Sequence, residues 1–199
     1  MSKKEVFAPA CLPACPLVLA SGSPRRRELM SDMGLCFTVR SADVDESLPD
    51  RISPRDAVLA LSERKCRAVL PSAAGCAVIA ADTVVALDGE ILGKPQDEAD
   101  ARRMLRALSG RTHEVFTGVA LGYGDRVIAR AARTAVSFRP LDEAEILAYI
   151  ETGEPMDKAG AYGIQGGAGR FVAATDGDID NVIGLPTRLL AEMLGELPK

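Results

Sequence analysis

Short apolar runs alternate with segments of helical periodicity from residue 17 to residue 197, and no Pro- or Ser-rich linker interrupts them. Apolar runs of about four to eight residues are typical of buried strands, and a period near 3.6 is typical of amphipathic helices. Alternation of the two favours an α/β fold. We therefore expect one α/β domain over residues 17–199, with a mixed central sheet and flanking helices, after a flexible extension over residues 1–16.

Composition excludes several classes of function. The 28 Asp+Glu residues exceed the 24 Lys+Arg residues, so the net charge of −4 gives no long-range attraction for nucleic acid or an anionic membrane. The single histidine, His113, excludes sites that need two imidazoles. An odd number of cysteines without a second close pair favours reduced thiols, and no apolar run reaches the roughly 18 residues of a membrane span. These features predict a cytoplasmic protein without nucleic-acid or membrane partners.

Turn residues and periodicity place the expected elements. Ser23, Ser53 and Asp142 precede helical patterns, and Asp142 with Glu145 forms a capping-box pattern. Asp88-Gly89 is typical of a tight hairpin turn. The pattern predicts helices at 24–33, 54–70, 97–108, 142–150 and from 186, strands at 17–20, 36–40, 76–81, 114–121, 126–131, 133–139 and 170–174, and a hairpin of 84–87 with 90–92.

Three arginines crowd the first turn of the helix that follows Ser23. A helix N-terminus carries about half a positive charge, so each cation there costs roughly 0.3–1 kcal/mol. That cost suggests that Arg25, Arg26 and Arg27 are used. Free backbone N–H groups, a hydroxyl and guanidinium forks favour a phosphate site, and a solvated basic face is the alternative. Neither a P-loop nor a dinucleotide-binding fingerprint is present.

Carboxylates mark a second candidate region. Asp82 follows a wholly apolar run, so we expect it at the carboxyl end of a strand, where α/β sheets bind ligands. It can take a proton from water or hold a divalent metal there, or merely cap a turn with Thr83. Glu46 lies in an acidic loop with Asp43 and Asp45. This loop either supplies a magnesium ligand or is simply solvated.

Lysines and a glycine-rich segment complete the candidates. Lys65 lies close to the apolar face of its predicted helix, so it either snorkels to solvent or points into a cleft. Lys94 follows the hairpin on a stiff turn and says little in isolation. The glycines of segment 157–167 permit close backbone approach, Lys158 adds charge, and Gln165 offers a donor and an acceptor to a base edge. A flexible surface loop is the alternative.

Six motifs, in order over about residues 17–194, resemble the Maf family of nucleoside triphosphate pyrophosphatases. They are Ala20-Ser21-Gly22-Ser23-Pro24-Arg25-Arg26, Val44-Asp45-Glu46, Ala81-Asp82-Thr83, Gly93-Lys94-Pro95, the segment 157–166 and Asn181-Val182-Ile183-Gly184-Leu185-Pro186. The resemblance implies an enzyme that cuts a nucleoside triphosphate between its α- and β-phosphates, using Mg²⁺ or Mn²⁺. It also implies an elongated, two-lobed fold related to the inosine triphosphate pyrophosphatases.

The resemblance assigns roles to residues of this chain. Asp82 matches the proton acceptor, and Glu46 and Asp82 are the metal-ligand candidates. The implied catalytic set is Asp82, Glu46, Lys65 and Lys94, and the implied substrate-binding set is Ser23, Arg25, Arg26, Thr83, Lys158 and Gln165. Arg25, Thr83 and Gln165 resemble the branch that acts on dTTP and UTP rather than the branch that prefers 7-methyl-GTP. Residues 1–16 have no counterpart in the family, and Ile179 stands where an aromatic residue is common.

These observations predict hydrolysis of dTTP and UTP, or of modified pyrimidine nucleotides, to the monophosphate and pyrophosphate. Such an activity limits incorporation of unwanted nucleotides, and a link to cell-division arrest is left open. The alternatives are a regulator that binds the nucleotide without hydrolysing it, and a kinase or nucleotidyl transferase, which the missing P-loop disfavours. A homodimer is expected by analogy, and His113 is predicted to be dispensable.

Overall fold

The computed structural model describes residues 14–197. Most of the predicted extension 1–16, including Cys11, lies outside the described residues, so its flexibility stays a prediction. The seven-stranded sheet has the order β2-β1-β3-β5-β6-β7, with β4 paired to β3. β1 pairs in parallel with β2 and β3, and every other pair is antiparallel. The predicted mixed sheet is therefore confirmed.

The strands are β1 (Leu17–Leu19), β2 (Phe37–Val39), β3 (Ala77–Leu87), β4 (Glu90–Leu92), β5 (Thr112–Tyr123), β6 (Arg126–Phe138) and β7 (Val172–Asp176). The α-helices are α1 (Pro24–Asp32), α2 (Pro54–Val69), α3 (Glu98–Leu108), α4 (Glu143–Ile150), α5 (Ile179–Ile183) and α6 (Thr187–Leu194). Short 3-10 helices η1–η4 cover Leu70–Ser72, Glu154–Asp157, Ala159–Ala161 and Gly167–Phe171.

The predicted helix starts are confirmed by their caps. The Ser23 and Ser53 hydroxyls each accept a backbone N–H from the first turn of α1 and α2. Asp142 and Glu145 form both halves of a capping box on α4. The Asp88-Gly89 turn joins β3 to β4 as expected.

Two predicted strand ends are wrong. β3 does not stop before Asp82 but continues to Leu87, because it pairs with β5 from Val78 to Ala86, and this pairing overrides the local polarity. Strands predicted at 126–131 and 133–139 are one strand, β6, because β5 pairs with it along its whole length. β7 begins two residues later than predicted, and α5 was not predicted because its five residues are too short for a periodic signal.

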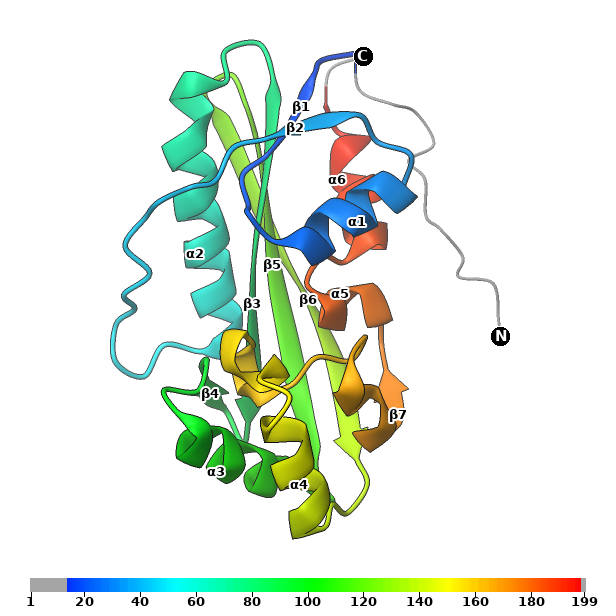
Figure 1. Ribbon diagram of the computed structural model, residues 1–199. Coiled ribbons are helices and arrows are strands. Elements are labelled where there is room, and N and C mark those ends of the chain that lie inside the picture. Colours follow the sequence, from blue (N-terminus) through cyan, green and yellow to red (C-terminus); the bar gives the residue numbers. More distant parts are fainter. Residues whose placement is uncertain (1–13, 198–199) are drawn as a thin grey trace.

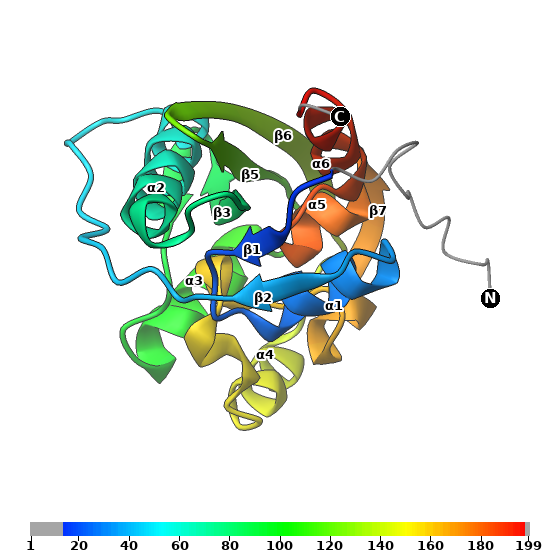
Figure 2. The ribbon, with the colours of Figure 1, turned by 90° about the horizontal axis from the view of Figure 1, so that it is seen from above.

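The molecule has two lobes, one at each end of the long strands β3, β5 and β6, which run through both (Figure 1). At one end α2 covers one face of the sheet, while α1, α5 and α6 cover the other face (Figure 2). At the other end α3 and α4 pack with β3, β5 and β6 around a separate aromatic core. The elongated, two-lobed single domain expected from the motifs is confirmed. Among residues 14–197, no helix has the length and apolar character needed to cross a bilayer.

α2 lies unusually close to the sheet. Gly118, which pairs with Asp82 across β5 and β3, has no room for a side chain, since a Cβ there would lie 2.2 Å from the carbonyl oxygen of Val58. This close approach brings the polar residues of α2 to the level of Asp82 on β3. Packing over a glycine thus positions the helix for the site.

The edge of β3 opens between two short partners. Along β3, the pairing with β1 ends at Ile79, which lies opposite Leu19. The pairing with β4 begins only at Val85, which lies opposite Leu92. Asp82 and Thr83 lie in the stretch between these partners. Asp82 is thus beyond the carboxyl end of β1 rather than at the end of its own strand. The prediction that Asp82 ends its own strand is therefore wrong, and a ligand site at this position stays a prediction.

Candidate functional site

A cleft with a volume of about 840 Å³ opens at this gap and is lined from both lobes. All the residues predicted for the site line it, namely Ser23, Arg25, Arg26, Glu46, Lys65, Asp82, Thr83, Lys94, Lys158 and Gln165. Successive side chains of a strand point to opposite faces of a sheet. Asp82 consequently meets Lys65 of α2, whereas Thr83 meets Arg26 of α1. The cleft draws on both faces of the sheet because the edge of β3 is open there.

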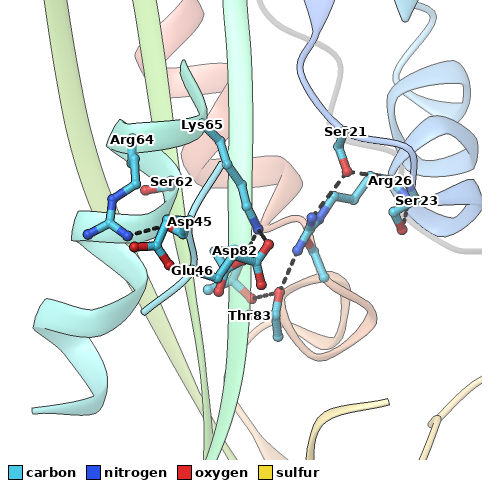
Figure 3. Close-up of polar contacts among 12 residues, drawn as sticks. Ser21, Ser23, Arg26, Asp45, Glu46, Ser62, Arg64, Lys65, Asp82 and Thr83 are labelled. Atoms are coloured by element: carbon cyan, nitrogen blue, oxygen red, sulfur yellow. Dashed lines mark hydrogen bonds and ion pairs between the residues drawn. The ribbon is translucent and has the colours of Figure 1, made fainter. Parts of the chain in front are cut away.

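We use the term floor of the cleft for Glu46, Lys65 and Asp82. In this floor, Lys65 lies between the two carboxylates. Its Nζ lies 2.5 Å from Asp82 Oδ1 and 2.7 Å from Glu46 Oε1 (Figure 3). Asp82 is only 8% exposed, and within residues 14–197 its Oδ2 has no hydrogen-bond partner. The hydrogen bond from Lys65 lowers the pKa of Glu46. The floor therefore offers oxygen atoms, held by one ammonium group, to a water or a metal ion.

The acidic loop before α2 has one member in the cleft. Arg64 donates to the backbone carbonyl oxygen of Asp45 (Figure 3) and to that of Ser47. The Asp45 carboxylate accepts from the backbone N–H and the hydroxyl of Ser47. Asp45 thus stabilises the loop itself. Of the three neighbouring acids, Asp43 and Asp45 do not line the cleft and Glu46 does. The loop is held by Arg64 of α2, and all three of its acids are exposed.

Arg26 is fixed by three protein acceptors (Figure 3). Its Nε donates to the carbonyl oxygen of Gly184 at 2.8 Å, Nη1 to Ser21 Oγ at 3.2 Å and Nη2 to Thr83 Oγ1 at 3.1 Å. A guanidinium has five N–H donors, so two remain for a ligand. Burial lowers the pKa of Arg26, and the nearby charge of Asp82 opposes that shift. Arg26 is therefore a rigid donor facing the cleft.

The hydroxyl of Thr83 has a defined direction. Thr117 Oγ1 donates to the backbone oxygen of Asn181 at 2.8 Å, which commits the only proton of Thr117. The 3.0 Å contact between the two threonine hydroxyls must then have Thr83 as donor. Thr83 also accepts from Arg26, so one lone pair remains for a ligand. Thr83 can accept from a bound group but cannot donate to it.

Arg25 and Lys158 share one carboxylate at the mouth of the cleft. Asp157 Oδ2 lies 3.9 Å from Arg25 Nη1, and Asp157 Oδ1 accepts from Lys158 Nζ at 2.6 Å. The hydrogen bond from Lys158 lowers the pKa of Asp157. The cations lining the cleft are Arg25, Arg26, Lys65, Lys94 and Lys158, and the carboxylates are Glu46, Asp82, Glu154 and Asp157. The cleft thus contains paired charges rather than an unbalanced positive cluster.

The opposite side of the cleft is formed by residues 154–167, which we call the glycine-rich wall. The backbone of Gly160 donates to the oxygen of Gly93 at 3.0 Å, so the wall is tied to the segment that carries Lys94. Lys94 and Gln165 are exposed and line the cleft. The side chains of Lys94 and Gln165 are thus placed where an entering ligand would meet them. Two 3-10 turns, Glu154–Asp157 and Ala159–Ala161, form the first part of the wall.

Several residues around the site were not predicted. They are Ser21 and Thr117, which fix Arg26 and Thr83, and Tyr149 and Glu154, which contact the backbone of residues 163–167. Ser21 belongs to the first motif, so that motif was a usable signal. Thr117, Tyr149 and Glu154 gave no signal, because their partners come from distant parts of the chain.

His113 lies outside the cleft, in the aromatic core of the second lobe. It is 1% exposed, its Nε2 lies 2.8 Å from the hydroxyl of Tyr162, and it packs edge-on against Phe138. Burial lowers its pKa to about 4. His113 is therefore a neutral core residue at ordinary pH, and its dispensability for turnover stays a prediction.

Cysteine and histidine contribute no metal cluster to the described part of the chain. Within residues 14–197, no group of three or more His, Cys, Asp or Glu side chains is placed to hold a metal ion. Cys15, Cys36, Cys66 and Cys76 are free thiols. A divalent metal at this site would need ligands beyond the protein carboxylates.

Comparison with known proteins places the chain in a family. The family described as Maf-like protein matches residues 16–197. The dTTP/UTP pyrophosphatase of Symbiobacterium thermophilum is 51% identical over 178 residues, covering 89% of this chain and 92% of that protein. The dTTP/UTP pyrophosphatase of Anaeromyxobacter dehalogenans strain 2CP-C is 53% identical over 186 residues, with coverage of 89% and 92%.

Among solved structures, the Staphylococcus aureus Ham1 protein aligns with a TM-score of 0.44 and 16% identity, over 62% of this chain and 71% of that one. That score is too low to support an argument. The family match covers every residue of the cleft named above, and each of the two relatives covers 89% of this chain. This chain belongs to the Maf-like protein family.

Proposed function

We propose that this protein hydrolyses dTTP and UTP to the nucleoside monophosphate and pyrophosphate. The observation that carries the proposal is the floor of the cleft, where Lys65 joins Asp82 and Glu46 beside the fixed donor Arg26. Relatives at about half identity over most of the chain bear the name dTTP/UTP pyrophosphatase, which supports the same substrates here. Modified pyrimidine nucleotides fit the same cleft chemistry.

The triphosphate is held by the cations of the cleft. The two remaining donors of Arg26 and the N-terminus of α1, with Ser23 at its cap, suit phosphate oxygens. Arg25 and Lys158 exchange their contact with Asp157 for the incoming phosphates. Such an exchange explains how a nearly balanced cleft accepts a polyanion, because the new partner carries more charge than the carboxylate that it replaces.

Hydrolysis needs a group that removes a proton from the attacking water. Asp82 is the proton acceptor in this proposal. The water oxygen bonds to the α-phosphorus, and the bond from that phosphorus to the α–β bridging oxygen breaks, which releases pyrophosphate. The proton of the water passes to Asp82. Lys65 and Lys94 neutralise the charge that develops on the departing pyrophosphate. A positioned general base typically contributes about 10²–10⁴-fold to the rate.

The floor fits the divalent metal implied by the family. Glu46 and Asp82 both reach one ammonium nitrogen, so their oxygens converge on one point where a cation is already favoured. Magnesium and manganese accept one or two carboxylates together with substrate phosphate oxygens and waters. Glu46 and Asp82 are the proposed ligands, and the metal would neutralise phosphate charge there.

Reading of the base is assigned to Gln165 and Thr83, and Arg25, which binds phosphate in this proposal, is the third specificity position. Gln165 offers a donor and an acceptor to the edge of a pyrimidine. Thr83 presents only a lone pair, so it meets a donor group of the nucleotide. The wall that carries Gln165 is where purines are refused.

The test is release of pyrophosphate from dTTP, UTP, dCTP and ATP with magnesium or manganese. We expect turnover of dTTP and UTP by the wild type, and its loss in Asp82→Asn. Tight binding of dTTP without product would instead establish the non-hydrolysing regulator. A nucleoside diphosphate or a transferred group would point to a kinase or transferase.

The remaining expectations concern the protein's surroundings. We propose a cytoplasmic location, which the free thiols of Cys15, Cys36, Cys66 and Cys76 support. A nucleotide is the proposed partner, with neither nucleic acid nor membrane. A homodimer is proposed by analogy, and sedimentation measurements check it. The link to cell-division arrest stays a prediction.

A further inference from the structure

Tyr149 and Glu154 form a clamp on the glycine-rich wall. The Tyr149 hydroxyl donates to Glu154 Oε1 at 2.9 Å and accepts from the backbone N–H of Gly163 at 3.2 Å. Glu154 Oε2 accepts from the backbone N–H of Gly167 at 3.0 Å. The two ends of the turn that carries Gln165 are therefore held by one connected pair of side chains.

The clamp is anchored in a rigid part of the molecule. Tyr149 lies in the last turn of α4, is 1% exposed and packs edge-on against Phe171. Burial raises the pKa of its phenol, so the hydroxyl keeps the proton that it donates to Glu154. Lys158 also donates to the backbone oxygen of Glu154 at 2.6 Å, which ties the clamp to the cation of the wall.

The glycines of the wall fit the clamp. A Cβ at Gly166 would lie 1.9 Å from Glu154 Oε1, and a Cβ at Gly167 would lie 3.3 Å from the ring of Tyr149. The carboxylate of Glu154 thus occupies the space that a side chain at position 166 would need. Glycine at this position lets the backbone settle against Glu154, which leaves Gln165 exposed on the cleft side.

We propose that Tyr149 and Glu154 are positioning residues for base selection, which hold the turn of residues 163–167 so that Gln165 meets the pyrimidine edge. This inference rests on the proposed function. It adds residues that touch neither the floor of the cleft nor the reacting phosphates. The clamp acts through Gln165, so its loss should change which nucleotide is preferred more than it changes the rate at saturation.

The experiment compares Tyr149→Phe with the wild type in kcat and KM for dTTP, UTP and dCTP. We expect KM for dTTP and UTP to rise about 3- to 10-fold, since each lost hydrogen bond is worth roughly a kcal/mol, while kcat changes less than about twofold. The preference for dTTP over dCTP should fall by a similar factor. Glu154→Gln keeps one carbonyl acceptor and should lie between Tyr149→Phe and the wild type.

A matched control and a double variant separate positioning from general damage. Glu151→Gln changes an exposed carboxylate near the end of α4 and should leave all constants unchanged. In a Gln165→Ala background, Tyr149→Phe should cause no further loss of preference, because the clamp acts through Gln165. If Tyr149→Phe lowers the preference for dTTP equally in the wild-type and Gln165→Ala backgrounds, the proposal is overturned. Direct contact of Glu154 with the nucleotide would give that result.

Two further readouts keep the outcome independent of turnover. Hydrogen exchange of the amides of Gly163 and Gly167 should quicken in Tyr149→Phe while α2 and β3 stay protected; unchanged exchange would contradict the clamp. If the wild type hydrolyses neither dTTP nor UTP, the proposed function fails. The clamp is then tested by the Kd for dCTP divided by the Kd for dTTP, a ratio that a clamp variant must lower toward one.

Discussion

The floor of the cleft and its glycine-rich wall are built in different ways. In the floor, charged side chains from α2, from β3 and from the loop before α2 form ion pairs, with Lys65 between Asp82 and Glu46. In the wall, the backbone amides of Gly163 and Gly167 instead contact two side chains, Tyr149 and Glu154. Lys65 and Asp82 of the floor thus lie on long regular elements, whereas Gln165 of the wall lies on a short clamped turn. Damage to the floor should lower turnover of every nucleotide, and damage to the wall should change their ranking.

Replacing Asp82 should give the largest effect. Asp82→Asn removes the proton acceptor, so we expect kcat to fall by roughly 10²–10⁴-fold for every accepted nucleotide. Their order of preference should persist, because the wall is intact. Pyrophosphate release measures this, with Asp88→Asn in the exposed hairpin turn as the control. Turnover of Asp82→Asn within a few-fold of the wild type would contradict the role of the floor.

Stability should also distinguish the floor from the surface. Lys65→Met leaves Asp82 buried without its partner, so we expect the free energy of unfolding to fall by about 3 kcal/mol. Arg67→Met breaks the exposed pair with Glu63 on the same helix and should cost less than about 0.5 kcal/mol. Urea denaturation compares them. Equal losses would show that the Lys65 contacts are no stronger than an exposed ion pair.

The core beneath the wall should respond to pH through His113. Burial holds the folded-state pKa of His113 near 4, below its ordinary value of 6.5. The unfolded chain therefore binds this proton first, and the contribution of neutral His113 to stability is complete above about pH 6.5. It is lost as the pH falls through 4, by roughly 3 kcal/mol at most.

The single histidine makes this pH dependence easy to isolate. Unfolding of the wild type and His113→Gln is compared between pH 4 and pH 7, and the difference in slope should appear only below about pH 6.5. Turnover of His113→Gln near neutral pH should stay close to that of the wild type, because His113 does not line the cleft. Loss of turnover in a folded variant would overturn its predicted dispensability.

The smallest expected effect concerns the support of Arg26. Thr117→Val removes the acceptor for the Thr83 proton, which frees that hydroxyl to turn away from Arg26. We expect KM to rise roughly 2- to 10-fold, and equally for dTTP and UTP, because Arg26 faces the phosphates. Thr117→Ser should restore the wild-type KM. A KM for dTTP and UTP that stays at the wild-type value in Thr117→Val would contradict this role of Thr117 in fixing Thr83 and Arg26.

The sequence predicted the groups of the floor better than their setting. Asp82 was found because a carboxylate interrupts an apolar run, yet that same polarity suggested the end of a strand. The long pairing of β3 with β5 decided otherwise. Tertiary pairing overrides local polarity, so strand ends are the least accessible feature of a single sequence.

The wall could be predicted only in part. Gln165 and Lys158 lie in a glycine-rich motif that signals close backbone approach. Glu154 and Tyr149 gave no such signal, because their role appears only when α4 packs beside residues 163–167. A pairing between backbone amides and side chains leaves no pattern of residue types. The same reason hid Thr117, whose partners come from β3 and α5.

A single panel tests the division between floor and wall most directly. It measures kcat/KM for dTTP, UTP, dCTP and ATP in the wild type, Asp82→Asn and Tyr149→Phe. We predict that Asp82→Asn lowers all measurable values by a common factor, while Tyr149→Phe narrows the gap between dTTP and dCTP with little change in kcat. A common factor in Tyr149→Phe, or a changed ranking in Asp82→Asn, would contradict the account.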